Sequence, residues 1–491
     1  MNRQSTFLVF LFALTCFRIA YSGWFELSLD EAYYWIWSQS LDFSYYDHPP
    51  MVAYMIALSG LLGESERFVR APAVLCATGV TWITYILASD IFGNRRTGFL
   101  TALLLNITLI FGVGSLMTTP DAPLSLFWML SLYFGYKIVD TQKPAYWWAL
   151  GLSFGLALIS KYNAALFAPA FLAFLLISRE NRRWLFRPQP YLAFALSIMV
   201  FAPVIYWNYL NDWVSFRFQL SHGLNPDSQG AIINAVEFWG GQVALYGLFL
   251  FFFIIASSIG IGRLGVKLKR DDFVYLSVMS VSLLAFFFVN SFMKRMEGNW
   301  AVVAYFSAIA VTPGFIALWA DRTLTAKREW VVYGYRASAV LAVLLIVYAH
   351  IQIVEPVLPM PQKYEISRRI YGWRMLAHET DKRLKPLKQG AFILANRYQI
   401  STLLTYYTSG HVESYITNGK GRFGYLGSVT RLIGEDAVYV TETGRSDLSR
   451  ISGYFEKTEP AGKLRIVRQG ELIREFRFFK CFNYKGGLIE I

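Results

Sequence analysis

Long apolar runs recur along most of the chain and are separated by short polar segments. Each run is close to the length of about 20 residues that an α-helix needs to cross the hydrocarbon core of a bilayer. We count about eleven such runs before residue 353. They cover residues 7–24, 69–89, 97–113, 122–138, 145–160, 163–178, 190–207, 236–261, 273–289, 300–319 and 331–350. This pattern predicts a polytopic α-helical membrane protein.

Two shorter amphipathic or apolar segments lie in the first polar connection. An aromatic segment follows Asp30, and a second segment covers residues 51–62 after Pro49 and Pro50. The second segment is shorter than the roughly 17 residues that a span requires, and the two prolines separate it from what precedes. We therefore expect interfacial helices in this connection.

The pattern changes after Ile353, where the composition becomes that of an ordinary soluble domain. Three prolines, Pro356, Pro359 and Pro361, mark a linker. The segments beyond it predict strands at residues 391–395, 412–416 and 437–441, a helix at 399–408, and a β-hairpin over 463–479. The sequence thus predicts a membrane domain of residues 1–352 and a small α/β domain of residues 353–491.

Composition supports a membrane protein, since 55% of the residues are hydrophobic and 16% are charged. The net charge of +13 does not indicate nucleic-acid binding, because the basic residues form short clusters between apolar runs. By the positive-inside rule these clusters belong to cytoplasmic loops. They are Arg95 with Arg96, Lys137 with Lys143, Arg179 to Arg187, Arg263 to Arg270, and Arg322 to Arg328.

This distribution predicts a multi-pass membrane protein with a cytoplasmic N-terminus. An odd number of spans then places the C-terminal domain on the outer, extracytoplasmic side. Residues 1–22 resemble a signal peptide, but the apolar run continues into Trp24, so we expect an uncleaved first span.

Several kinds of chemistry are disfavoured by what the sequence lacks. The three cysteines, Cys16, Cys76 and Cys481, suggest neither a disulfide nor a metal site. The chain has no P-loop, no dinucleotide-binding glycine motif, no His-Glu-x-x-His and no Asp-x-Asp in the outer loops. We therefore expect no cofactor and no metal, and we expect an activated group on the outer face to arrive on a lipid.

The first outer connection carries an unusual set of acids and aromatics, with no Lys or Arg between Trp24 and Pro50. Asp30 and Glu31 precede an aromatic helix, and Asp47 and His48 follow. Taken alone, Asp30 and Glu31 could simply complement the helix dipole, and His48 could be a hydrogen-bonded turn residue. A carboxylate beside a bilayer can also take a proton from a substrate.

A third acidic site on the same predicted face changes the balance toward function. Asp121 lies directly before Ala122 and Pro123, where it also suits the N-cap position of the next helix. We expect these three acidic sites to converge on one cavity.

Basic and polar groups on this face are few, and an anionic leaving phosphate would need such partners. They are Lys161, Arg217, His222, Lys294 and Arg295, and Glu297, Asn299 and Trp300 make the last segment unusually polar. A single Lys at a helix end is more often a lipid-headgroup anchor, so Lys161 has that simpler interpretation.

These motifs, in this order and on this face, resemble the GT-C glycosyltransferases of the family 39 type. That group includes protein O-mannosyltransferases and the lipid A aminoarabinose transferases. The resemblance rests on Asp30-Glu31, the segment 46–50, the segment 119–123, the region 207–219 and the segment 294–300. It covers most of the membrane region, and the tail resembles the outer domain of some bacterial members.

The resemblance implies a GT-C-like fold and an inverting transfer of sugar from a polyprenyl phosphate to an acceptor on the outer face. Asp30 would be the general base, Glu31 and Asp121 would shape the site, and Asp47 with His48 would lie beside the donor phosphate. The aminoarabinose transferases have a lysine where this chain has His48, so the sugar and the acceptor stay open. Lipid A, another envelope glycan and a protein are all candidate acceptors.

Two alternatives from other functional classes compete with a glycosyltransferase. Edge charges also mark transport routes, so a transporter or flippase for a lipid-linked saccharide is the second hypothesis. A transporter would more often carry charges within several spans or paired broken helices. The third hypothesis is a noncatalytic sugar-binding membrane protein whose aromatic residues stack on sugars.

Overall fold

The computed structural model describes residues 3–224, 230–321, 325–358, 366–417, 429–443 and 448–488. It divides the chain into two compact units. The first comprises Met1–Tyr21, Asp47–Val52 and Arg70–His350, and the second comprises Ser22–Tyr46, Ala53–Val69 and Ile351–Ile491. Much of the first polar connection therefore belongs to the same unit as the C-terminal domain, whereas the sequence assigns that connection to the membrane region.

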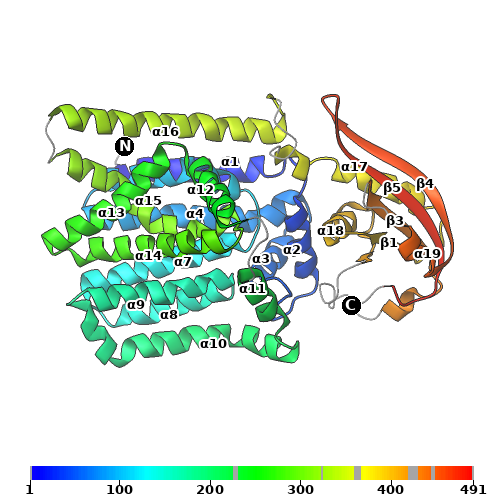
Figure 1. Ribbon diagram of the computed structural model, residues 1–491, viewed down its shortest axis with the longest axis horizontal. Coiled ribbons are helices and arrows are strands. Elements are labelled where there is room, and N and C mark those ends of the chain that lie inside the picture. The colour runs from blue at the N-terminus through cyan, green and yellow to red at the C-terminus, as the bar shows by residue number, and fades with distance from the viewer. Residues whose placement is uncertain are drawn as a thin grey trace. The chain divides into compact units, whose positions relative to one another are not determined.

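The first unit is a bundle of helices. Its helices are α1 (Arg3–Tyr21), α4 (Glu66–Phe92), α5 (Arg95–Ile107), α6 (Leu109–Gly114), α7 (Asp121–Thr141), α8 (Ala145–Leu158), η1 (Tyr162–Leu166), α9 (Phe167–Ile177), η2 (Asn181–Phe186), α10 (Pro188–Leu210), α11 (Val214–Leu224), α12 (Ala231–Tyr246), α13 (Leu250–Leu268), α14 (Asp271–Met293), η3 (Gly298–Ala301), α15 (Val302–Ala320) and α16 (Thr325–Val354). Within this unit α7, α8, α9, α10 and α14 run alongside one another (Figure 1).

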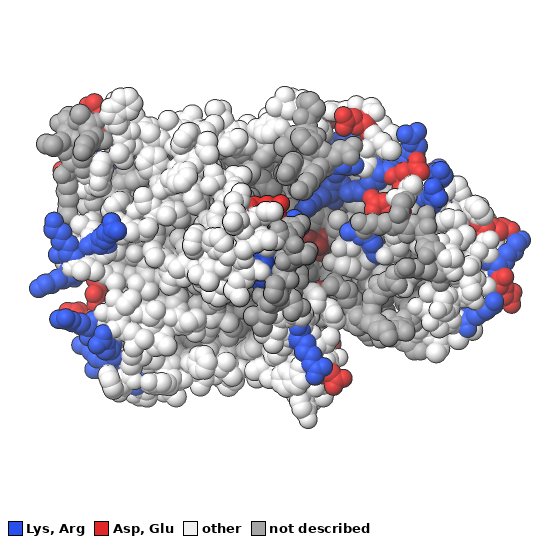
Figure 2. Space-filling model, viewed as in Figure 1, with Lys and Arg blue, Asp and Glu red and all other residues white. Residues whose placement is uncertain are grey.

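Eight helices among the described residues are long and apolar enough to cross a membrane, and three further apolar helices are shorter. The chain is therefore a polytopic α-helical membrane protein, as predicted, although the count of about eleven spans stays a prediction. Many Lys and Arg side chains gather at the end of the bundle where α13 passes into α14 (Figures 1 and 2). The inside or outside location of each terminus also stays a prediction.

Close helix packing in this unit depends on small residues. A Cβ atom added to Gly151 of α8 would lie 2.5 Å from the carbonyl oxygen of Ala193 in α10. A side chain at this position would therefore push the two helices apart, and packing of this kind stabilises helix association where no water drives it.

One predicted span is wrong. Residues 236–261 were expected to form a single helix, but α12 ends at Tyr246 and α13 begins at Leu250. Gly247, between them, has a φ of +92°, which a helix does not allow. A single glycine in an apolar run is tolerated in helices, so the sequence pattern did not reveal the break.

The predicted helix at residues 97–113 is also divided. Thr108 is extended between α5 and α6, with φ of −70° and ψ of 137°. Beside the break, the buried Arg18 of α1 donates a hydrogen bond from Nη2 to Oδ1 of Asn106 at 2.8 Å, and its guanidinium lies 5.6 Å from the ring centroid of Phe111. Arg18 thus contacts the residues on both sides of the interruption.

The second unit is built around a five-stranded sheet in the order β2-β1-β3-β5-β4. Its elements are α2 (Leu29–Gln39), most of α3 (Met51–Gly60), η4 (Ile366–Arg369), α17 (Trp373–Leu384), β1 (Phe392–Ala395), α18 (Tyr398–Tyr407), β2 (Ser414–Ile416), η6 (Val429–Leu432), β3 (Ala437–Glu442), α19 (Ser449–Ser452), β4 (Phe455–Arg468) and β5 (Glu471–Tyr484). These confirm the predicted small α/β domain, with a hairpin longer than expected.

Strands β2, β1 and β3 are parallel, whereas β5 is antiparallel to both β3 and β4. Helix α17 covers one face, where the Trp373 ring lies 6.3 Å from Phe476. Helix α2 belongs to this unit and packs on α18, with the ring centroids of Tyr33 and Tyr398 4.9 Å apart. Aromatic residues of the first polar connection, Tyr33 among them, therefore contact the α/β domain.

Candidate active site

Helix α2 presents Asp30 and Glu31 in different environments. Asp30 is exposed, whereas Glu31 is fully buried. Glu31 forms a capping box, because its carboxylate accepts a hydrogen bond from the Ser28 N–H at 2.9 Å and its own N–H donates to Ser28 Oγ. The first carboxylate thus lies at the surface of its unit, and the second holds the start of the helix.

Asp121 lies in the first unit, in the first turn of α7, and two side chains hold its carboxylate. Lys161 donates from Nζ to Oδ1 at 2.7 Å, and Asn299 donates from Nδ2 to Oδ2 at 2.7 Å. The Lys161 side chain is 7% exposed and that of Asp121 is 20% exposed, so water screens this ion pair only weakly. Lys161 is a fixed partner of an acid here, which is not expected of a lipid anchor.

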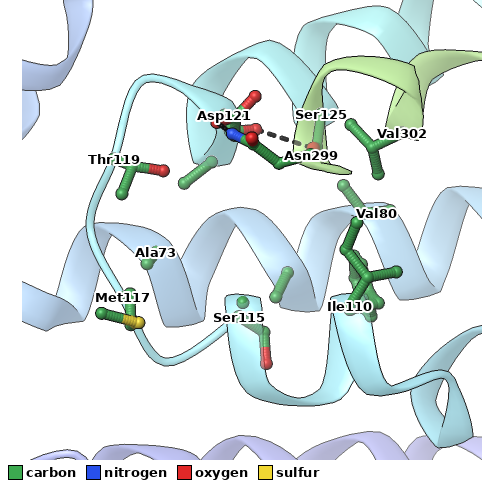
Figure 3. A pocket seen from close by; sticks show the side chains of 14 residues that line it. Ala73, Val80, Ile110, Ser115, Met117, Thr119, Asp121, Ser125, Asn299 and Val302 are labelled. Carbon is green, nitrogen blue, oxygen red and sulfur yellow. Dashed lines mark hydrogen bonds between the residues drawn. The ribbon is translucent and has the colours of Figure 1, made fainter. Parts of the chain in front are cut away.

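A cavity of about 200 Å³ opens beside this network. Figure 3 shows Asp121 and Asn299 joined by a hydrogen bond on one side of it, with Ala73, Val80 and Ile110 opposite. Its polar lining comes from Ser115, Thr119, Asp121, Ser125 and Asn299, and the remaining residues are apolar. The site therefore combines an apolar interior with a charged and hydrogen-bonding edge.

The segment that carries Asp47 and His48 is fastened to the same unit by its backbone. The Asp47 carbonyl accepts a hydrogen bond from Nε2 of Gln219 in α11 at 2.7 Å. The Met51 N–H donates to the carbonyl of Ile159 at the end of α8 at 3.1 Å, two residues before Lys161. Asp47 is buried and His48 is half-buried.

Helix α11 carries two of the basic residues predicted for the site, Arg217 and His222. Arg217 is exposed. His222 falls in the last turn of the helix, and its side chain lies outside the described residues. Ser215 connects α11 to the Lys161 segment, because its Oγ is 2.8 Å from the hydroxyl of Tyr162.

The segment after α14 contains one buried cation. Lys294 is 9% exposed, its Nζ lies 5.1 Å from the ring centroid of Trp300, and burial lowers its pKa below the ordinary value of 10.5. Arg295 forms an exposed ion pair with Glu237 at 3.9 Å, and Glu297 is exposed. Of this segment, Asn299 is the residue whose side chain reaches the Asp121 network.

The structure therefore joins Asp121, Lys161 and Asn299 directly, and the backbone of Asp47 is tied to neighbouring elements. The expected convergence of Asp30 with Asp121 stays a prediction, because these carboxylates belong to different units. The sequence analysis missed Ser125, whose position one helical turn after Asp121 was a usable signal. It also missed Gln219, whose contact with Asp47 is long-range and left no sequence signal.

Comparison with solved structures identifies the fold. The crystal structures of ArnT from Cupriavidus metallidurans match with TM-scores of 0.63 for the apo state and 0.62 for the state bound to undecaprenyl phosphate. The apo match covers 97% of this chain and 98% of that one at 13% sequence identity. The family described as dolichyl-phosphate-mannose-protein mannosyltransferase matches residues 47–207. The fold of this chain is therefore that of the ArnT structures.

Two curated relatives match part of the chain in sequence. The lipid A galacturonosyltransferase RgtD of Rhizobium johnstonii is 26% identical over 302 residues, which are 60% of each chain. The undecaprenyl phosphate-alpha-4-amino-4-deoxy-L-arabinose arabinosyl transferase of Pectobacterium carotovorum is 24% identical over 315 residues. That match covers 58% of this chain and 54% of the relative. The matched region is thus less than two thirds of either relative.

Proposed function

We propose that this protein is an inverting GT-C glycosyltransferase. It transfers a sugar from a polyprenyl-phosphate donor to a glycolipid acceptor of the cell envelope, with lipid A as the first acceptor to test. The reaction takes place on the periplasmic face of the inner membrane, the N-terminus is cytoplasmic, and the C-terminal domain is periplasmic. The names of the relatives support the lipid-linked donor and the lipid A acceptor.

The observation that carries this proposal is the Asp121–Lys161–Asn299 network at the edge of an apolar cavity. A polyprenyl-phosphate sugar is itself apolar at one end and polar at the other. A cavity with apolar walls and a few fixed polar groups is the usual way in which proteins orient such a molecule. Because Asp121 is already paired, its role is to position Lys161 and Asn299 rather than to accept a proton.

Asp30 is the general base in this proposal. It is exposed, and the capping box of Glu31 fixes the helix that carries it. A carboxylate can deprotonate an acceptor hydroxyl as that oxygen attacks the anomeric carbon, if the two atoms lie within hydrogen-bond range. We assign Glu31 to the fold of α2, because its carboxylate already receives the backbone N–H of Ser28.

The leaving phosphate requires cations, and Lys294 is the best candidate. Its ammonium is buried, so its field is less screened than that of the exposed Arg295 or Arg217. Asp47 and His48 belong to the same donor-binding group, with His48 as a hydrogen-bond donor to phosphate. Amino-acid cations suffice for a phosphate monoester leaving group, so no metal is assigned a role.

The test is transfer by purified protein in detergent or nanodiscs. Protein is incubated with a panel of undecaprenyl-phosphate sugars and lipid A, and glycosylated product is identified by mass spectrometry. Asp30→Asn should abolish transfer while donor binding is retained, because only the proton acceptor is removed. Asp42→Asn, which changes another exposed carboxylate of the same connection, should leave transfer intact.

Two results would contradict the proposal. Turnover by Asp30→Asn at the wild-type rate would remove the proposed base. Movement of intact donor across vesicles by wild-type protein, with no glycosylated product from any acceptor, would support a transporter in its place.

A further inference from the structure

The second unit contains a group of arginines that the proposed reaction does not use. We define the arginine cluster as Arg368, Arg369, Arg397 and Arg474. Glu442 is the acid that contacts it, at 3.7 Å from Nη1 of Arg397 and 3.8 Å from Nε of Arg474. Arg369 is exposed and forms no ion pair with a described residue. Glu442 thus contacts two of the four guanidinium groups, and Arg368 and Arg369 lie near enough to Arg474 to act on its charge.

Burial raises the free-energy cost of holding like charges close together. The Arg474 side chain is 14% exposed, and its guanidinium lies 4.3 Å from the ring centroid of Trp373. Burial, assisted by the neighbouring arginines and opposed by Glu442, lowers the pKa of Arg474 to about 10. A protein rarely gathers like charges in a partly desolvated place unless an anion joins them.

Two polar atoms at this place lack protein partners. Nη1 of Arg474 and Oδ1 of Asn396 are buried, and neither has a hydrogen-bond partner among the described residues. Buried donors and acceptors are nearly always paired, so these atoms indicate positions that a ligand's oxygen and hydroxyl would fill. The first atom belongs to an arginine of the cluster, and Asn396 directly precedes Arg397 in the chain.

The sheet topology puts these residues where parallel sheets usually bind ligands. Arg397 follows the carboxyl end of β1, and Glu442 ends the adjacent parallel strand β3. The chain leaves β1 toward β2 and leaves β3 toward the hairpin on the opposite side. Such a point, where consecutive connections diverge, leaves a crevice at the carboxyl ends of the strands. Helix α18 also begins at Arg397, so the positive end of its dipole points there.

The cluster is connected to the helix that carries Asp30. The ring of Tyr398, next to Arg397, lies 4.9 Å from that of Tyr33 in α2 in a tilted contact, and Tyr33 lies one turn after Asp30 on the same helical face. All of these residues belong to the second unit. The cluster and the proposed general base therefore lie on helices α18 and α2 or on elements next to them, and these two helices pack together.

We propose that the arginine cluster binds a phosphate group of the acceptor glycolipid and thereby presents an acceptor hydroxyl to Asp30. This inference rests on the proposed function, because it names the acceptor class of the same reaction. Arginine is the appropriate residue, since its planar guanidinium forms paired hydrogen bonds to phosphate oxygens. Figure 2 shows further Lys and Arg side chains over α17, which would attract an anionic lipid to this part of the unit.

The test measures binding of lipid A to the full-length protein in neutral detergent. Bisphosphorylated lipid A and the same lipid after phosphatase treatment are titrated separately. Wild-type protein should bind the phosphorylated form roughly ten- to hundredfold more tightly, as expected for charge-assisted hydrogen bonds. The double variant Arg369→Gln/Arg397→Gln should lose that preference, and Arg465→Gln, an exposed arginine of β4 outside the cluster, should retain it.

Competition identifies the source of the phosphate. Phosphatidylglycerol should not displace phosphorylated lipid A at equal concentration, because it lacks the sugar hydroxyls that Asn396 would accept. Equal displacement would overturn the assignment to an acceptor and indicate a general phospholipid surface. A phosphate preference that survives in the double variant, or that is absent from the wild type, would overturn the site itself.

Two controls keep the result interpretable. Unchanged melting temperature and unchanged binding of undecaprenyl phosphate show that the double variant is folded. Binding is read without turnover, so Asp30→Asn should keep the phosphate preference. Absence of the preference in wild-type protein that transfers sugar would refute this inference and leave the proposed function standing.

Discussion

The Asp121–Lys161 ion pair gives the most quantitative prediction. At 2.7 Å and an effective dielectric constant of about 20, the Coulomb attraction between the two charges is about 6 kcal/mol before desolvation is subtracted. Removal of one partner leaves the other charge buried, which costs about 3–5 kcal/mol in comparable cases. We expect Asp121→Ala and Lys161→Met each to lower the free energy of unfolding by about 3 kcal/mol.

The double variant Asp121→Ala/Lys161→Met should lose less free energy of unfolding than the sum of the losses in the two single variants. A coupling energy of about 2 kcal/mol is expected, because the second substitution removes the charge that the first one left unpaired. The assay is reversible unfolding in mixed SDS micelles, followed by tryptophan fluorescence. The loss of the Asn299 hydrogen bond occurs in both arms that lack Asp121, so it cancels in the coupling energy.

A second lysine–aspartate pair provides the matched control. Lys137 and Asp90 are 2.6 Å apart, but their side chains are 18% and 33% exposed. Water screens this pair more strongly, so its coupling energy should be about 0.5 kcal/mol. Equal coupling energies for the two pairs would refute the argument that burial makes the Asp121–Lys161 pair strong.

Three further predictions concern single positions. Because burial lowers the pKa of Lys294, activity that needs the charge of its ammonium should fall as the pH rises, with a midpoint below 10.5. In a profile of kcat/KM against pH, Lys294→Arg should move this alkaline limit upward, and Arg295→Lys should not. Gly247→Ala should lower the melting temperature, because a residue with a side chain pays about 1–3 kcal/mol to adopt a φ of +92°. Gly240→Ala should raise the melting temperature, because Gly240 lies within helix α12 and a Cβ there would meet open space. Glu31→Gln should keep the wild-type kcat, and Glu31→Ala should lose about 1 kcal/mol of unfolding free energy, because Glu31 is part of the capping box of α2. A large loss of kcat in Glu31→Gln at unchanged stability would instead make Glu31 catalytic.

The membrane spans were predictable because apolar length is a local property of the sequence. The breaks within them were not. Thr108 and Gly247 interrupt runs whose hydrophobicity continues, and the side chain of Arg18 contacts residues on both sides of the break at Thr108. Hydropathy does not record such contacts.

The residues of the candidate site were partly predictable, because a charge beside an apolar run is also a local property of the sequence. Charged residues beside apolar runs stand out, so Asp121, Lys161 and Asn299 were all named from the sequence. Their pairing was not predictable, because 40 residues separate Lys161 from Asp121 and 178 separate Asn299 from it. The arginine cluster was missed altogether, since ordinary arginines in a soluble domain carry no local sign of their neighbours.

The sequence by itself determined that this protein crosses a membrane, that a small α/β domain follows, and which acids and bases are candidates for chemistry. These properties depend on hydrophobicity, residue spacing and charge along the chain. Only the tertiary structure decided that Glu31 caps a helix, that Lys161 and Asn299 hold Asp121, and that Arg397 and Arg474 both contact Glu442. The physical reason is that hydrogen bonds and ion pairs form between residues brought together by folding, whatever their separation in sequence.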